Sequence, residues 1–344
     1  MNRDYSRNAL DLFRILATVQ VFLGHLITHF SLPGLTDGVY FVRGVPILFA
    51  LCGFLAAQSL DRYSTKKFLI RRCVRVLPGF WSCILINSLI IFLLYAVTPT
   101  LIQAGVYFAT QLLGLNFYTG DWLRGYGVGT PNGVLWTIGV QLQFFLLAPI
   151  AHKLLKKLRL GKSAVLVALL AIFSIVLEQI SGLLPEMLYK LISVTVAPYL
   201  YFLLLGMLCY SFRDQIIPAL EKVRWFLLGA YILWKLAEIH LRLPHILDGV
   251  MYNTVTTLLL CLLIFAFGFS FKWRMKLDLT YGFYLYHMVF MNIAIHLGYN
   301  RLHWDLHSLG ILVFITLLPL VFAWLSHKCI EKPAATLAEK KEGV

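Results

Sequence analysis

The sequence predicts an all-α, polytopic membrane protein, a helical bundle of about ten transmembrane helices with both termini in the cytoplasm. Of its 344 residues 60% are hydrophobic, and the mean hydropathy is +0.78, whereas soluble proteins are only about 45–50% apolar. The net charge of +14 comes from short basic segments that alternate with long apolar runs. The positive-inside rule explains this alternation better than nucleic-acid binding does. We therefore expect lipid, and no nucleic acid, among the partners.

Nine apolar runs are each long enough to be candidates for a membrane span, which takes about 20 mostly apolar residues. They are residues 8–30, 39–58, 79–97, 133–151, 163–184, 189–211, 250–271, 279–298 and 308–327. A weaker candidate is 225–242, because Lys235, Glu238 and His240 interrupt its apolar character. The run 101–118 is ambiguous.

Charge decides how the two uncertain runs are interpreted. The segments 61–78 and 152–162 are both rich in Lys and Arg, which predicts that both are cytoplasmic. Since two spans already separate them, we expect 101–118 to be an interfacial or re-entrant helix. The run 225–242 is kept as a span, because the later basic segment would otherwise face outward. The predicted cytoplasmic turns are 61–78, 152–162, 212–224 and 272–278.

These spans predict one transmembrane domain over residues 1–330, followed by a short, solvated cytoplasmic tail, 331–344. The first run exceeds the 7–15 residues, approximately, of a signal-peptide core and lacks a cleavage site, so we expect it to be retained. The six cysteines show neither CxxC nor metal-ligand spacing. No metal site and no disulfide framework are predicted.

A polar stripe runs down the first apolar run. At 100° per residue, His25 returns to within about 20° of Arg14 and lies about 16 Å further along the helix. Asp11, Thr18 and His29 fall within about 60° of that line. Ionisable side chains inside a span are costly and typically face a cavity or a partner. His25 could exchange protons with a hydroxyl group, although anchoring at the membrane interface is the alternative and suits His29 better.

Three arginines, Arg71, Arg72 and Arg75, gather where the third span is predicted to begin. Positive-inside anchoring could account for them by itself. The more specific interpretation is a cradle for a phosphorylated cytosolic ligand such as coenzyme A, because guanidinium groups bind phosphate through paired hydrogen bonds. Pro78 fits the start of the helix, whose N-terminus would strengthen phosphate binding.

Polar groups also occur in the fourth, seventh and ninth spans. Gln141 and Gln143 in the fourth span could bond to a neighbouring helix or line a polar cavity, and the sequence leaves this open. His287 lies well inside the ninth span and is a second cavity candidate. Lys235 and Glu238 stand three residues apart and are expected to pair, mainly for structural reasons. The small residues of the run 44–54 favour close helix packing.

Together these motifs resemble those of the acyltransferase family 3, integral-membrane O-acyltransferases that modify bacterial surface glycans. Residues 10–25 resemble LDxxRxxA…H, 44–54 resemble GVxxFFxLSGF, 71–78 resemble RRxxRxxP, 136–145 resemble WSLxVExxFY, 284–287 resemble YLxH, and 331–333 resemble a closing E-x-P. The matches occur in order and cover most of the chain.

The resemblance implies an acyl-CoA, most simply acetyl-CoA, as the cytosolic donor substrate, with no bound cofactor. It implies a glycan or lipid-linked glycan as acceptor and a multi-pass protein of the bacterial cytoplasmic (inner) membrane. The implied catalytic residues are His25, Arg14 and Asp11, and the implied donor-phosphate ligands are Arg71, Arg72 and Arg75. The residues considered for cavity lining are Gln141, Trp136, Tyr284 and His287.

Some alternatives stay open at this point. Gln141 stands where the family commonly has Glu, and an amide cannot act as a base. The partner of His25 is therefore Asp11, Asp121 or no acid at all. The alternative function is a transporter or flippase for a glycan or a small anionic solute, although the two similar halves of many transporters are not evident. A purely structural scaffold would leave the buried ionisable groups unexplained, and the sequence does not predict the oligomeric state.

Overall fold

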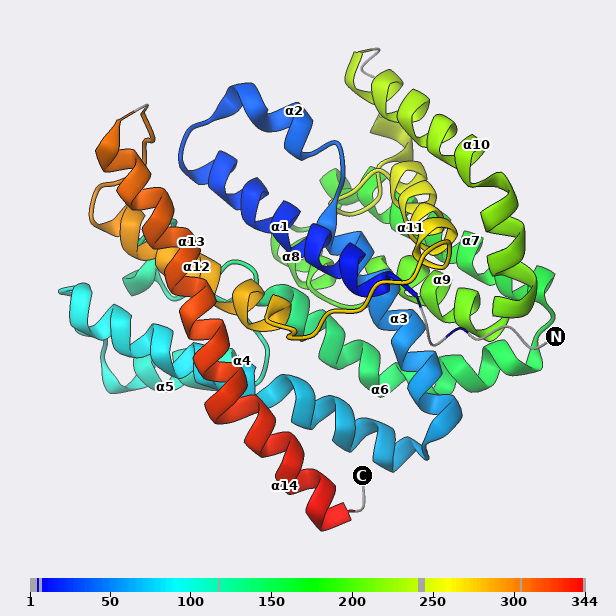
Figure 1. Cartoon of the computed structure of the whole chain (residues 1–344). Helices are drawn as coiled ribbons and strands as arrows, with labels where there is room; N and C mark the ends of the chain where they lie inside the picture. Colours follow the sequence, from blue (N-terminus) through cyan, green and yellow to red (C-terminus); the bar gives the residue numbers. More distant parts are fainter. Residues whose placement is uncertain (1–4, 6–7, 117, 241–244, 304, 343–344) are drawn as a thin grey trace. The chain divides into compact units, whose positions relative to one another are not determined.

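The computed structural model describes residues 5, 8–116, 118–240, 245–303 and 305–342 (Figure 1). Within these ranges every regular element is a helix, apart from one isolated antiparallel bridge between Asp248 and Asn253, which confirms the all-α class. The chain forms two compact units. The first comprises Met1–Gln20, Tyr40–Thr65 and Gln143–Lys276, and the second comprises Val21–Val39, Lys66–Leu142 and Leu277–Val344.

Three long helices are continuous and contribute residues to both units. They are α1 (Leu10–His29), α4 (Thr65–Leu94) and α6 (Trp136–Lys157). The other helices of the first unit are α3 (Gly44–Arg62), α7 (Leu160–Gln179), α8 (Glu186–Ser193), α9 (Leu200–Ser211), α10 (Arg213–His240) and α11 (Thr254–Gly268). Those of the second unit are α2 (Thr36–Val39), α5 (Leu101–Leu112), α12 (Thr280–His296), α13 (Leu306–Ser326) and α14 (Lys332–Glu342). Short helical turns connect them at η1 (Pro33–Leu35), η2 (Asp121–Leu123), η3 (Ser181–Leu183), η4 (Ala197–Tyr199), η5 (His245–Leu247) and η6 (His327–Glu331).

Six helical stretches of the described chain are long and apolar enough to cross a membrane, or seven if α8 and α9, bent by 52° at their break, form one span. The six are α1, Thr36–Arg62, α4, α6, α7 and Leu306–Lys340. The other predicted spans fall on α10, which carries several charges, and on α11 and α12, which have 15 and 17 residues. The predicted run 101–118 contains α5, whose 12 residues are fewer than the about 20 that a span needs.

The expected helix start at Pro78 is wrong, because α4 begins at Thr65 and contains Pro78 in its interior. Ser64 precedes the helix and is a residue type favoured at N-caps. The Lys and Arg residues that follow have high helix propensity, so the basic segment is itself helical. The three predicted phosphate ligands therefore lie well inside a helix and not at its N-terminus.

Two further segments, predicted to be a cytoplasmic turn and a solvated tail, are largely helical. The predicted turn 212–224 belongs to α10, which starts at Arg213. Most of the predicted tail 331–344 forms α14, which follows α13 through the π-helical turn η6. Lys, Glu, Leu and Ala, which are strong helix formers, dominate the tail, so the helix can continue there.

Several helices begin with the capping interactions that their sequences favour. Thr100 and Gln103 form a capping box at the start of α5. Asp305 caps α13 by accepting a hydrogen bond of 2.7 Å from the Ser308 backbone. Hydrogen bonds from the Ser308 backbone and hydroxyl lower the pKa of the Asp305 carboxyl. Such caps satisfy N–H groups that have no partner within the helix.

In the first unit, α3 and α9 have the most extensive contact among the described helices (Figure 1). A Cβ atom on Gly53 would lie 1.9 Å from the Leu203 carbonyl oxygen, and one on Gly206 would lie 1.9 Å from the Ala50 carbonyl oxygen. Two helix backbones can approach this closely only where neither has a side chain in the way. This contact confirms that the run 44–54 serves helix packing.

In the second unit, α12 packs along α13, and buried amides fasten the loop that precedes α6. Asn292 accepts a 3.0 Å hydrogen bond from the Val128 backbone and donates to the carbonyl oxygens of Thr130, at 3.0 Å, and Pro131, at 2.9 Å. Asn87 donates a further 2.9 Å bond to Pro131. This loop is thereby a fixed part of the unit.

Candidate active site

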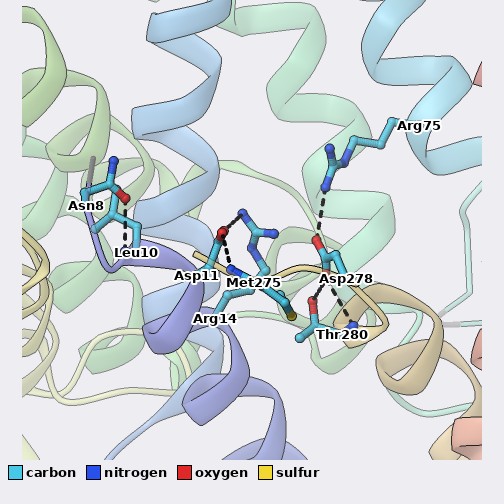
Figure 2. Close-up of polar contacts among 8 residues, drawn as sticks. All are labelled: Asn8, Leu10, Asp11, Arg14, Arg75, Met275, Asp278 and Thr280. Carbon is cyan, nitrogen blue, oxygen red and sulfur yellow. Dashed lines mark hydrogen bonds and ion pairs between the residues drawn. The ribbon is translucent and has the colours of Figure 1, made fainter. Parts of the chain in front are cut away.

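Two of the predicted catalytic residues form an ion pair at the start of α1. Asn8 caps the helix, and one turn later the Arg14 Nη2 atom lies 3.3 Å from the Asp11 Oδ1 atom (Figure 2). The other carboxylate oxygen of Asp11 accepts a 3.4 Å hydrogen bond from the Met275 backbone. Both side chains are largely buried, with 20% of Arg14 and 29% of Asp11 exposed. Asp11 therefore fixes the guanidinium group and ties α1 to the segment after α11.

The second unit contains a cluster of three histidines, His25, His29 and His287. The rings of His25 and His29 stack with centroids 5.6 Å apart, and the ring of His287 is 5.6 Å from that of His25. Phe22 and Phe283 pack against His287 at centroid distances of 6.0 Å. The predicted cavity candidate His287 thus lies beside His25. His29, for which interfacial anchoring was expected, also belongs to this cluster.

The buried ring of His287 has a defined orientation. Its Nδ1 atom lies 3.2 Å from the Phe283 carbonyl oxygen, which can only accept, so Nδ1 carries a proton. In a neutral imidazole the other nitrogen, Nε2, then has a free lone pair. This atom is buried and finds no hydrogen-bond partner among the residues that the structure describes. A buried acceptor without a partner is costly, which is typical of a site that binds a polar group.

Of the acids considered as partners for His25, Asp121 forms an ion pair with Arg124 at 2.8 Å, and its side chain is 93% exposed. Asp11 binds Arg14, as described above. Among the described residues, the neighbours that lie against His25 are two other imidazoles: His29, whose Nε2 atom lies 3.5 Å from the His25 Nδ1 atom, and His287.

The three predicted phosphate ligands project from about 100° of the α4 surface, because Arg71, Arg72 and Arg75 are separated by one and three residues. The Arg72 guanidinium lies over the Phe68 ring at 5.5 Å. Arg75 is exposed and lies 3.3 Å from the Asp278 carboxylate (Figure 2). The structure therefore keeps these cations on one side of a single helix.

Helix α12 connects α4, the helix that carries the three arginines (the arginine helix), to the histidine cluster. Asp278, the partner of Arg75, accepts a hydrogen bond of 3.1 Å from the backbone of Thr280, the first residue of α12. His287 follows seven residues later, about 10 Å along the helix. Between them the buried Tyr284 hydroxyl lies 2.9 Å from the Thr137 hydroxyl and its ring packs edge-on against His287. A carboxylate that holds a cation of α4 thus lies just before α12, and an imidazole that can accept a proton lies about two turns into α12.

The remaining predicted cavity residues lie on α6. Trp136 begins this helix, and both Trp136 and Gln141 are half-buried. The nearby Gln143 bonds to the backbone of Val194 and Val196, at 3.3 Å and 3.0 Å, and so braces the bend between α8 and α9. This contact assigns Gln143 to packing.

Two acidic residues near the arginines were not among the predicted site residues. Asp278 directly contacts Arg75. Glu331, which was expected in a solvated tail, is only 15% exposed and accepts a 2.8 Å hydrogen bond from Ser326. Its Oε1 atom would lie 3.1 Å from a Cβ on Gly79, one turn after Arg75. The signal for Asp278 was its position just before a predicted span, and the signal for Glu331 was its position directly after the last apolar run.

The described ranges contain no group of three or more His, Cys, Asp or Glu side chains placed to hold a metal ion. The chemistry that the second unit offers lies in its imidazoles, which can accept a proton, and in its guanidinium groups, which bind phosphate.

The chain matches known proteins over nearly its whole length. A family model described as Acyltransferase domain matches residues 7–328. Nodulation protein 10 of Rhizobium leguminosarum bv. viciae is 27% identical over 352 residues, covering 96% of this chain and 94% of that protein. The low affinity tryptophan permease of Proteus vulgaris is 30% identical over 97 residues only, 26% of this chain and 23% of the permease. No solved structure matches the chain significantly. The chain therefore belongs to the acyltransferase family 3 and is a multi-pass membrane O-acyltransferase.

Proposed function

We propose that the protein transfers an acyl group, most simply acetyl, from cytosolic acyl-CoA to a hydroxyl group of a cell-surface polysaccharide or its lipid-linked precursor. It acts in the bacterial cytoplasmic membrane with ten spans and both termini in the cytoplasm. The region 101–118 is then an interfacial or re-entrant helix. The basic segments at the ends of the apolar helices support this orientation.

The observation that carries this function is the position of two different groups on α12. At its start, Asp278 binds Arg75 of the arginine helix, and seven residues into it His287 packs against His25. In an acyl-CoA the phosphates are separated from the reactive thioester by the long pantetheine arm. A donor therefore needs cations at one place and a proton acceptor at another. Asp278, just before α12, holds the α4 cation Arg75, and His287 of α12 packs against the proton acceptor His25.

In the proposed reaction His25 acts as general base. It takes the proton of the acceptor hydroxyl while the oxygen attacks the thioester carbonyl carbon. The carbon–sulfur bond then breaks, the new ester forms, and coenzyme A leaves as a thiolate that takes up the proton. His287 packs against the His25 ring and positions it. The Asp11–Arg14 pair keeps the polar side of α1 organised.

The function is tested by comparing the O-acyl groups of surface polysaccharides, by mass spectrometry, between cells with and without the gene. We expect one ester to disappear and to return when the gene is restored. In parallel, purified protein in lipid nanodiscs is incubated with acetyl-CoA and tested for donor binding and thiol release. Unchanged polysaccharides together with failure to bind or cleave the donor would contradict the proposal and favour transport.

The double variant Arg72→Gln/Arg75→Gln is expected to raise the KM for acetyl-CoA by about 10- to 100-fold per lost phosphate contact, because a hydrogen bond to a charged group contributes about 1.5–3 kcal/mol. The matched control is Arg159→Gln/Lys162→Gln, which removes the same charge from exposed residues in another basic segment. Steady-state kinetics with acetyl-CoA and with its 3′-dephospho form separate phosphate binding from general charge effects. Equal KM values for the variant, the control and the wild type would rule out this donor site.

A further inference from the structure

The first unit contains a cavity of about 750 Å³ that none of the residues discussed above as catalytic or donor-binding lines. Small-molecule sites have volumes of about 300–1,000 Å³. The start of α3, the end of α7, the second half of α10, the start of α11 and the turn that contains Asp248 surround it. Its lining includes charged and aromatic side chains, among them Arg43, Glu178, Trp234 and Lys235.

A buried ion pair forms one wall of this cavity. The Lys235 ammonium lies 2.7 Å from Glu238 Oε1, which confirms the predicted pairing, and only 4% of the Lys235 side chain is exposed. Glu238 Oε2 accepts a 2.6 Å hydrogen bond from the Thr256 hydroxyl. Burying two charges is expensive, and apolar residues of similar volume would often be as stable. Ionisable groups that persist inside a membrane helix therefore indicate a binding function.

The cavity and a cluster of basic residues lie at opposite ends of α3 in the first unit. At that basic end Asp61, in the last turn of α3, is 3.0 Å from His152 and also pairs with Lys156, both near the end of α6. The cavity is at the other end of α3, where Arg43 precedes its first residue. Because the basic end is cytoplasmic in the proposed orientation, the cavity opens toward the outer face.

We propose that this cavity binds a sugar unit of the acceptor, and that the sugar is neutral or amino-bearing. The proposal rests on the glycan acceptor proposed above. Carboxylates accept hydrogen bonds from sugar hydroxyls, and the flat faces of aromatic rings such as Trp234 pack against the C–H face of a sugar ring. The Lys235 ammonium has three N–H donors, and its contact with Glu238 uses one of them.

The charge of the lining sets the class of sugar. It contains three carboxylates, those of Glu178, Glu238 and Asp248, and two cations, those of Arg43 and Lys235. An acidic sugar or a phosphate would add a negative charge to a lining that already has an excess of one negative charge. A neutral sugar adds none, and an amino sugar balances the excess.

The test is saturation-transfer difference NMR on the full-length protein in lipid nanodiscs, without donor, using cellobiose, a disaccharide of glucosamine and cellobiouronic acid as probes. The double variant Lys235→Met/Glu238→Gln removes both charges at nearly constant volume. A second variant, Ile246→Trp, narrows the cavity from an exposed position. The matched control is Glu186→Gln/Lys190→Met, which removes an exposed Lys–Glu pair from α8.

We expect saturable binding of the neutral and amino disaccharides to the wild type and the control, a Kd raised at least about 10-fold in both cavity variants, and weaker binding of the acidic disaccharide. Binding that is unchanged in the variants, or absent from the wild type, would overturn the sugar site, and stronger binding of the acidic probe would overturn its class. Acyl transfer is measured separately on the same samples. If the wild type transfers the acyl group and the cavity variants do not change sugar binding, only this inference is contradicted. If the wild type binds the sugars but transfers no acyl group, only the proposed function is contradicted.

Discussion

Replacing His25 with alanine is expected to reduce acyl transfer by about 10²–10⁴-fold, which is the usual contribution of a general base. The side chain is half-buried against His287, so its loss removes a proton acceptor and little else of the fold. The measurement is the rate of acetyl transfer from acetyl-CoA to acceptor, normalised to the amount of folded protein by size-exclusion chromatography. A variant that keeps most of its activity would contradict the catalytic role of His25.

Two neighbouring variants make this test specific. His29→Ala removes the ring stacked on His25 and is expected to keep a substantial share of the activity. His287→Phe keeps a flat ring among Phe22 and Phe283 but removes both nitrogens. If the unpartnered Nε2 atom of His287 binds a polar group during the reaction, this variant lowers kcat with little change in the KM for acetyl-CoA. If only packing matters at this position, kcat stays at the wild-type value.

The variant Gly53→Ala is expected to have the largest effect on stability. Its new methyl group would lie 1.9 Å from the Leu203 carbonyl oxygen, so α3 and α9 would have to move apart over their whole contact. Overpacking usually costs about 1–3 kcal/mol, and a backbone atom that cannot rotate away brings the cost to the upper end or beyond. Thermal unfolding, followed by loss of the monodisperse peak in size-exclusion chromatography, measures the decrease in Tm.

The control for this variant is Gly161→Ala, in the first turn of α7, where a Cβ meets nothing within 4 Å. It adds the same methyl group to a helix without a contact and is expected to leave the Tm unchanged or slightly raised, since alanine has the higher helix propensity. Equal Tm values for the two variants would show that the α3–α9 contact tolerates separation.

Local sequence patterns correctly predicted the features that interactions between residues close in sequence determine. The all-helical class, the long apolar helix beginning near Asn8 and the Lys235–Glu238 pair follow from hydropathy and from side chains three residues apart. The start of α4 did not follow, because proline is favoured in a first helical turn and disfavoured inside a helix, and yet Pro78 lies in the interior of α4. The competing preference, that of a long run of Lys and Arg for helix, decided the outcome.

Tertiary contacts limited what could be predicted about the site. The sequence identified His25 and His287 separately, but residues more than 250 positions apart show no mutual signal in one sequence, so their contact was open. The pairing of Arg75 with Asp278 was open for the same reason. Glu331 was misjudged because hydropathy falls after α13, whereas the helix itself continues into α14.

The loop held by Asn87 and Asn292 has a practical consequence for mapping membrane topology. Its length between α5 and α6 would normally recommend it for an inserted reporter or epitope, since loop tips tolerate insertion best. Here an insertion between Val128 and Pro131 would break the bonds that two buried amides make to the backbone. Gly34 and Gly38, where an added atom would meet nothing within 4 Å, are the better insertion points on the connection after α1. A reporter inserted at either glycine would show which side of the membrane this connection faces without disturbing the fold.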